Sequence, residues 1–344
     1  METIIIAEAG VNHNGSILLA KKLVDTAKDA GADFVKFQTF KASKLVTKKA
    51  KKADYQIKNI NDGNDSQYEM LKKLELTEEM HIELISYCKE KKIGFLSTAF
   101  DIESANYLKN IGITLFKIPS GEITNYPLVK RIAEIAKEVI VSTGMCYMYE
   151  IENTIKILEK NGISKSKITI LHCNTDYPTP MEDVNLLAMN SIKKQLKTKV
   201  GYSDHTAGIE VPIAAVTLGA QCIEKHFTLD KTLPGPDHIA SLEPNELIQM
   251  VKSIRNIEKA LGNGVKEPSD SEKKNINIVR KSIHIKEDLK KGSLISASNI
   301  IMKRPGNGIS PMKYDEIIGK KTIHNLSKDQ MLSFSDLELW EKFV

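Results

Sequence analysis

Short apolar runs alternate with amphipathic segments from the N-terminus to residue 261. The apolar runs have the length of buried parallel strands, and most are followed by a segment with apolar residues at helical spacing. The predicted strands are Thr3–Ala7, Asp33–Gln38, Gly94–Thr98, Thr114–Ile118, Glu138–Ser142, Ile168–Cys173, Thr198–Ser203 and Gln221–His226. The predicted helices are Ser16–Ala30, Glu78–Lys92, Ile102–Asn110, Pro127–Ala136, Tyr149–Asn161, Asn185–Leu196, Ile209–Leu218 and Glu243–Leu261.

Strict alternation of eight strands with eight helices predicts an α/β fold, a (β/α)8 TIM barrel. One long interruption, Lys41–Leu76, is polar and rich in lysine, and we interpret it as an extended loop after the second strand. The alternative is an open doubly wound sheet. No glycine-rich dinucleotide fingerprint follows the first strand, which argues against that alternative.

The pattern changes after Gly262. We assign residues 1–265 to the barrel, 266–280 to a polar linker and 281–344 to a small, turn-rich domain. Within that domain, Ile283–Asn299 weakly resembles Ile323–Asp336, and the loop between the copies presents Arg304 in a Pro-Gly setting. A domain of this size buries little core, so we expect it to dock on another surface.

Composition excludes several classes of protein. With 41% hydrophobic and 27% charged residues, the 344-residue chain is typical of a soluble globular protein, and its apolar runs are too short to cross a membrane. Cys88, Cys146, Cys173 and Cys222 are dispersed, which fits a reducing cytoplasm. The net charge of +5 is spread over scattered lysines without interleaved aromatic residues, so nucleic-acid binding is not expected.

Polar residues stand at the C-terminal end of every predicted strand, where a barrel builds its active site. Because side chains alternate faces along a strand, two members of a pair such as Ser203 and His205 can both point inward. A purely structural core would not tolerate so many unpaired polar groups. The set is Glu8, Lys36, Gln38, Ser97, Thr98, Lys117, Ser142, Thr143, Asn174, Thr175, Ser203, His205, Glu224 and His226.

Two histidines mark adjacent strands in this set. His205 and His226 lie near the ends of the seventh and eighth strands, which the helix between them makes parallel neighbours about 5 Å apart. Two imidazoles at that spacing can share one metal ion and suit Mn, Fe, Co or Zn better than Mg or Ca. The alternative is a pair of hydrogen-bonded core histidines.

Two lysines indicate an anion site. Lys36 and Lys117 supply fixed positive charge, and nearby hydroxyls supply donors, a combination that suits a phosphate or phosphorylated carboxylate. The hydroxyls belong to Thr98, Ser120, Ser142 and Ser203. The alternative is that each lysine forms a structural ion pair with Glu8, Glu122 or Glu224. A metal beside an anion site implies Lewis-acid activation of a carbonyl or of water.

The motifs that carry these residues resemble the sialic acid synthase family over essentially the whole chain. They are Ala7–Gly15, Val35–Thr39, Phe116–Glu122, Ser142–Met145, Leu171–Pro180, Gly201–Thr206, Ile223–Thr228 and Lys303–Gly306. The resemblance implies a TIM barrel followed by an antifreeze-like (SAF) domain. It also implies a homodimer in which the small domain of one protomer caps the barrel of the other.

The resemblance further implies a reaction in which phosphoenolpyruvate, an open-chain N-acyl mannosamine-type sugar and water give a nine-carbon 2-keto acid and phosphate. Our main expectation is N-acetylmannosamine as acceptor and N-acetylneuraminate as product. The alternative is 2,4-diacetamido-2,4,6-trideoxymannose, which gives N,N'-diacetyllegionaminate. We expect the loop that contacts the sugar to lie within Lys41–Leu76.

The resemblance implies a role for each residue that stands at a matching position of a family motif. His205 and His226 would hold a divalent metal, Mn2+ or Mg2+, and Glu8 and Glu122 would handle water and protons. Phosphoenolpyruvate would be held by Lys36, Thr98, Lys117, Ser120, Ser142 and Ser203, and the sugar would be met by Gln38, Tyr177, Asp237 and the Arg304 of a second protomer.

One motif departs from the pattern, because this chain has Cys173-Asn-Thr175 where some relatives have Cys-Thr-Asn. Either Thr175 replaces an amide ligand or Asn174 supplies it. Two other classes of protein remain open from the residues alone. One is a metal-dependent aldolase or lyase on the same barrel, and the other is a sugar- or ice-binding protein without catalytic activity.

Overall fold

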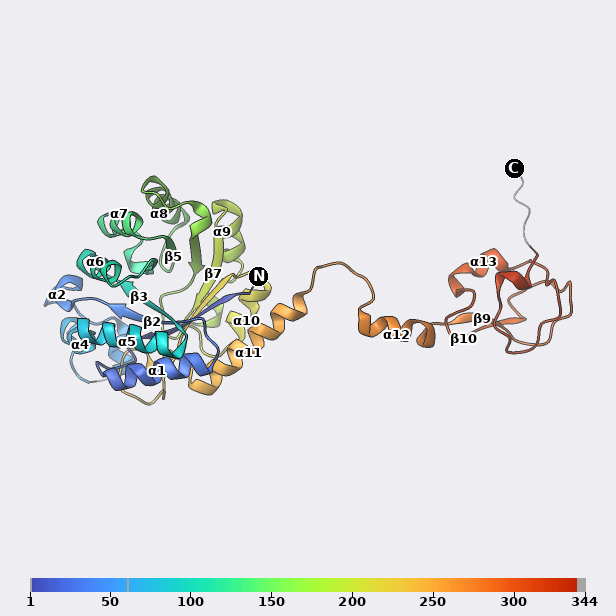
Figure 1. Cartoon of the computed structure of the whole chain (residues 1–344), viewed down its shortest axis with the longest axis horizontal. Coiled ribbons are helices and arrows are strands. Elements are labelled where there is room, and N and C mark those ends of the chain that lie inside the picture. Colours follow the sequence, from blue (N-terminus) through green and yellow to red (C-terminus); the bar gives the residue numbers. More distant parts are fainter. Residues whose placement is uncertain (1, 61, 339–344) are drawn as a thin grey trace. The chain divides into compact units, whose positions relative to one another are not determined.

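The computed structural model describes residues 2–60 and 62–338. By contacts it divides into two compact units, Met1–Gly262 and Asn263–Val344 (Figure 1). Among the described helices, none is both long enough and apolar enough to cross a bilayer.

The first unit is a closed barrel of parallel strands, each paired with its sequence neighbours and the last paired with the first. The strands are β1 (Ile4–Gly10), β2 (Phe34–Thr39), β3 (Gly94–Ala99), β4 (Leu115–Ile118), β5 (Glu138–Ser142), β6 (Ile168–His172), β7 (Lys199–Asp204) and β8 (Cys222–His226). Closure confirms the predicted barrel and excludes the open sheet.

Helices surround the barrel, as Figure 1 shows. They are α1 (Ile17–Asp29), α5 (Glu78–Lys91), α6 (Ile102–Asn110), α7 (Tyr126–Ile135), α8 (Met148–Lys160), α9 (Ala188–Leu196), α10 (Glu210–Thr217) and α11 (Pro244–Leu261). Each corresponds to a predicted helix, with ends that differ by at most three residues. The main core lies between these helices and the outward-facing strand residues.

The barrel lumen is apolar at the bottom and polar at the top. Ile6, Leu96, Ile140, Leu171 and Cys222 form a separate buried cluster. Ile6, Leu96, Ile140 and Cys222 each precede a polar strand-end residue by two positions, so alternation places both on the inner face. The lumen is tight here: a Cβ on Gly201 would lie 2.2 Å from the Cys222 carbonyl oxygen.

The segment between β2 and α5 is not the plain loop that its polar composition suggests. It contains α2 (Ala42–Leu45), α3 (Asp54–Ile60) and α4 (Gln67–Leu74). Helix α4 forms because Ser66 caps its N-terminus and because Met70 and Leu74, one turn apart, are both buried. Such short helices depend on tertiary packing, which a propensity argument does not see.

The second unit begins with α12 (Asp270–Val279), which lies inside the segment assigned to the linker. Its N-terminus carries a Ser269–Glu272 capping box. Strands β9 (Ser282–Ile285) and β10 (Ile300–Lys303) pair antiparallel, and α13 (Tyr314–Ile317) follows.

The two weakly similar copies in this unit pair with each other. Leu289 and Leu326 exchange two backbone hydrogen bonds of 2.8 Å, and further antiparallel bridges lie five residues to either side. The core of the unit is small: Ile283, Ile285, Ile295, Ile300, Ile309, Ile317, Leu326, Leu332 and Leu337.

Candidate active site

A cavity of about 410 Å3 opens at the C-terminal ends of the barrel strands. It brings together most of the residues predicted for the site. They are Glu8, Lys36, Gln38, Thr98, Lys117, Ser120, Glu122, Ser142, Thr175, Tyr177, Ser203, His205, Glu224, His226 and Asp237.

Four charged side chains form a buried network across the lumen. Lys36 Nζ lies 2.6 Å from Glu8 Oε2 and 3.7 Å from Glu224 Oε1. Lys117 Nζ donates to both Glu224 oxygens, at 2.8 and 3.0 Å. The hydroxyls and amide around them continue the network: Lys36 donates to Thr98, Gln38 to Glu8 and Ser203 to Glu224.

The network gives the carboxyl groups of Glu8 and Glu224 very different pKa values. Burial raises the pKa of Glu8 to about 7, even though Lys36 acts in the opposite direction. Burial would also raise the pKa of Glu224, but the charges of Lys117 and Lys36 outweigh it and lower that pKa to about 2. Glu224 therefore remains a carboxylate that holds both lysines, while Glu8 can gain or lose a proton near neutral pH.

The ion-pair alternative for the two lysines is thus present in the structure. These ion pairs do not satisfy all the polar groups of the cavity, because several buried polar atoms have no hydrogen-bond partner among the described residues. These are Ser142 Oγ, Thr175 Oγ1 and His226 Nδ1, all in residues that line the cavity. Unpartnered buried polar atoms are costly, and their convergence on one cavity indicates a polar ligand.

The two histidines lie side by side, with ring centroids 5.4 Å apart. The Asn174 carbonyl accepts a hydrogen bond from His205 Nδ1 at 2.5 Å, which leaves His205 Nε2 as the ring atom with a free lone pair. Burial lowers the pKa of His205 to about 4 and holds the pKa of His226 well below its usual value. Both imidazoles are therefore neutral, as metal ligands must be.

These donors fit a divalent ion that takes its remaining ligands from water or substrate. Within the described part of the chain, no group of three His, Cys, Asp or Glu side chains is arranged to hold a metal. Asp237 is the nearest carboxylate partner of His226, with Oδ2 3.7 Å from Nδ1. Burial raises the pKa of Asp237 to about 6.

Tyr177 packs against the histidines, with its ring centroid 4.1 Å from that of His205 and 5.6 Å from that of His226. The ring of Tyr55, from α3, packs against that of Tyr177 at a tilt of 30°, with the ring centroids 5.1 Å apart. The segment between β2 and α5 therefore reaches the candidate metal ligands through two aromatic rings.

Four of the named residues do not line this cavity: Ser97, Thr143, Asn174 and Arg304. The Ser97 hydroxyl shares a hydrogen bond with Thr39 at 2.7 Å, and the Thr143 hydroxyl donates to the Leu171 carbonyl at 2.9 Å. Asn174 does not line this cavity: its side chain donates to the Asp183 carbonyl at 2.7 Å, and Thr175 takes the position facing the lumen. Arg304 belongs to the second unit, where its Nε donates to the Val279 carbonyl at 2.8 Å.

The sequence predicts a sugar-contacting loop within Lys41–Leu76 but does not indicate which of its residues line the cavity. Leu45, Val46, Tyr55, Gln56, Gln67, Met70, Leu71 and Leu74 all line the cavity. The usable signal was Ser66-x-x-Glu69, which marks a helix N-terminus before Met70 and Leu74.

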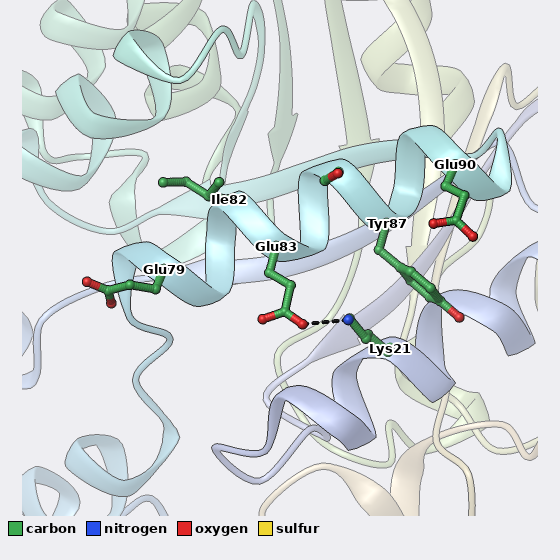
Figure 2. A pocket seen from close by; sticks show the side chains of 7 residues that line it. Lys21, Glu79, Ile82, Glu83, Tyr87 and Glu90 are labelled. Carbon is green, nitrogen blue, oxygen red and sulfur yellow. Dashed lines mark ion pairs between the residues drawn. The ribbon is translucent and has the colours of Figure 1, made fainter.

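A second hollow lies on the outside of the barrel, between α1 and α5 (Figure 2). It is lined by surface side chains, and its lysine, Lys21, is already paired with Glu83 at 2.5 Å. It has none of the buried, opposed charges of the strand-end cavity, so we do not regard it as an active site.

Comparison with known proteins identifies the family. The model of the NeuB family matches residues 23–266, and that of the SAF domain matches residues 280–338. The chain belongs to the NeuB family.

Among its relatives is N,N'-diacetyllegionaminic acid synthase of Campylobacter jejuni, 55% identical over 96% of this chain and 99% of that protein. The synthase of the same name from Legionella pneumophila is 48% identical, over 98% of this chain and 95% of its own length. The crystal structure of the N-acetylneuraminic acid synthetase from Leptospira borgpetersenii superposes with a TM-score of 0.70 at 36% identity. That superposition covers 80% of this chain and 90% of the other.

Proposed function

We propose that this NeuB-family enzyme condenses phosphoenolpyruvate with 2,4-diacetamido-2,4,6-trideoxymannose and water, giving N,N'-diacetyllegionaminate and phosphate. The observation that carries the chemistry is the buried network of Lys36, Lys117, Glu8 and Glu224 beside two neutral imidazoles in one cavity. The choice of acceptor rests on the two legionaminic acid synthases, which favour our alternative over N-acetylmannosamine.

In this proposal the lysines bind the anionic donor. Lys36 and Lys117 exchange part of their contact with Glu8 and Glu224 for the carboxylate and phosphate of phosphoenolpyruvate. Ser142 and Thr175, whose hydroxyls lack partners among the described residues, supply hydrogen bonds to the same ligand.

The bond-forming step joins C3 of phosphoenolpyruvate to the aldehyde carbon of the open-chain sugar. The aldehyde oxygen takes up a proton and becomes a hydroxyl. A water molecule adds at C2 and gives up two protons, which balance the one taken up by that hydroxyl and the one that leaves with phosphate; cleavage of the C2–O bond to phosphate then leaves the 2-keto acid. Glu8, with a pKa of about 7, is suited to orient the water and accept its proton. A divalent ion at His205 and His226, Mn2+ or Mg2+, would supply Lewis acidity toward the aldehyde oxygen.

We also propose that the second unit completes the site of another protomer in a homodimer. The support is the resemblance, together with the small core of that unit and its Arg304 loop. An arginine on a cap can close over a polar sugar and exclude water. The free cysteines fit a cytoplasmic location, which we propose as well.

Incubation with phosphoenolpyruvate, Mn2+ and each candidate sugar tests the function. We expect equal amounts of phosphate and of a product with the mass of N,N'-diacetyllegionaminate, and a higher kcat/KM for the diacetamido sugar. Turnover of the sugar without phosphate release would instead indicate an aldolase or lyase. A higher kcat/KM for N-acetylmannosamine would favour an N-acetylneuraminate synthase, and no turnover with either sugar would leave a binding protein.

A further inference from the structure

The strand-end cavity has a second wall of different character. In addition to the lysines and histidines, the cavity is lined by residues from the segment between β2 and α5, among them Leu45, Val46, Met70, Leu71 and Gln67. The part of the lining that comes from the strand ends is therefore charged, and the part that comes from this segment is largely apolar with two amides, Gln67 and Gln56. The Gln56 oxygen already accepts a hydrogen bond from the Ala53 amide at 2.9 Å.

Packing alone does not account for this wall. Met70 and Leu74 are buried in a cluster with Val11 and Phe40, which holds α4 against the barrel. Leu45 and Leu71 also pack against this cluster, but they and Val46 are only partly buried, and all three line the cavity. Partly exposed apolar side chains around a hollow are typical of a site that receives an apolar group.

The wall is fixed in place at three points. Glu75 Oε1 accepts a hydrogen bond from the Ala42 amide at 2.8 Å, which ties the two ends of the segment together. Asn59 donates to the Pro236 carbonyl at 2.8 Å and so joins α3 to the loop that carries Asp237. The packing of the Tyr55 ring against the Tyr177 ring is the third contact.

We propose that this wall is a specificity subsite that receives the methyl-bearing end of the acceptor sugar and selects a 6-deoxy sugar with a second acetamido group. The proposal rests on the proposed function, which places the aldehyde at the histidines. The far end of such a sugar carries a C-methyl and an acetyl methyl, whereas N-acetylmannosamine carries hydroxyls there.

Leu45, Val46 and Leu71 can cover methyl groups but leave hydroxyls without partners, which disfavours the hydroxylated sugar. Gln67 offers both a donor and an acceptor for the second amide. The apolar side chains and Gln67 together therefore match both features that distinguish the two acceptors.

The test compares kcat/KM for the diacetamido sugar and for N-acetylmannosamine in Val46→Thr and Leu71→Asn, two near-isosteric polar replacements. The matched control is Ile57→Thr, on α3 of the same segment, 44% exposed and outside the cavity lining. The ratio of two substrates on one protein sample does not depend on the folded fraction, so a partly unfolded variant still gives an answer.

We expect the ratio to fall about 10-fold or more in each wall variant, the size that one methyl contact is worth in an apolar pocket. It should stay unchanged in Ile57→Thr, and KM for phosphoenolpyruvate should be unaffected in all three. An unchanged ratio in both wall variants would overturn the subsite while leaving the proposed function intact. A wild-type preference for N-acetylmannosamine would overturn the proposed function itself, and the subsite with it.

Discussion

Replacement of Lys225 by methionine should destabilise the barrel more than any surface substitution. Lys225 and Asp204 face away from the lumen, between the two histidine strands, and neither has any exposed surface. Lys225 Nζ lies 2.5 Å from Asp204 Oδ2 and donates to the Thr206 carbonyl at 2.5 Å. Methionine fills similar space but leaves the Asp204 carboxylate buried without a cation.

Breaking a buried pair from one side costs about 3–5 kcal/mol, because the remaining charge is uncompensated. The double variant Asp204→Asn/Lys225→Met has no stranded charge, and the amide oxygen of the introduced asparagine would still accept a hydrogen bond from Thr206. The double variant should therefore lose only about 1–2 kcal/mol of unfolding free energy, which is the contribution of the missing hydrogen bonds.

Urea unfolding followed by circular dichroism at 222 nm measures the change in unfolding free energy of each variant. The signal reports on the barrel, because most helices belong to the barrel unit. Lys231→Met is the matched control: Lys231 pairs with Glu246 at 2.7 Å, but both side chains are over one-third exposed, so its loss should be below about 1 kcal/mol. If the double variant is as unstable as Lys225→Met, the loss comes from packing and the stranded-charge argument is wrong.

Four further predictions concern the site, the cap and pH. Lys117→Met should raise KM for phosphoenolpyruvate about 10- to 150-fold, the worth of a charge-assisted bond, with a much smaller effect on KM for the sugar; an unchanged value would contradict the anion site. His226→Ala should give a folded, inactive protein, and chelation should abolish wild-type turnover until Mn2+ is restored; full activity after exhaustive chelation would rule out the metal. Mixed Arg304→Ala and His226→Ala proteins, each inactive alone, should regain up to about a quarter of wild-type activity if caps act between protomers of a two-fold dimer, whereas a cap on its own barrel gives no recovery. Burial lowers the pKa of His13 to about 4 from 6.5, so its contribution to stability is full above pH 6.5 and is lost as pH falls toward 4. His13→Asn should reduce the acid loss of unfolding free energy over that window by roughly 3 kcal/mol, and an unchanged slope would show that His13 is not responsible.

The alternation of apolar runs and amphipathic segments was sufficient to predict the barrel, because each unit of that pattern is local. The inward direction of Lys36, Lys117, His205 and His226 also followed from local alternation. Which carboxylate each lysine meets could not be predicted, since Lys117 and Glu224 come from β4 and β8 and meet only across the closed lumen.

The parts that escaped prediction depend on contacts between distant residues. Helices α2 to α4 lie in a lysine-rich stretch and pack against Val11 and Phe40. The local pattern Ser66-x-x-Glu69 indicates the start of α4, but no local pattern indicates the contacts with Val11 and Phe40. At Asn174 and Thr175, adjacent polar residues follow a strand end, and only the course of the loop decides which one faces the cavity.

Closure of the barrel means that every strand already has two neighbours, so the segment between β2 and α5 adds no strand to the sheet. Its two ends are also joined to each other, through Ala42 and Glu75. The segment is therefore a single insert between β2 and α5, and its contacts with the barrel through Val11, Phe40 and the Pro236 carbonyl are made by side chains and not by strand pairing. Grafting residues 42–75 from a synthase with a different acceptor would change the apolar wall without altering a single strand-end charge.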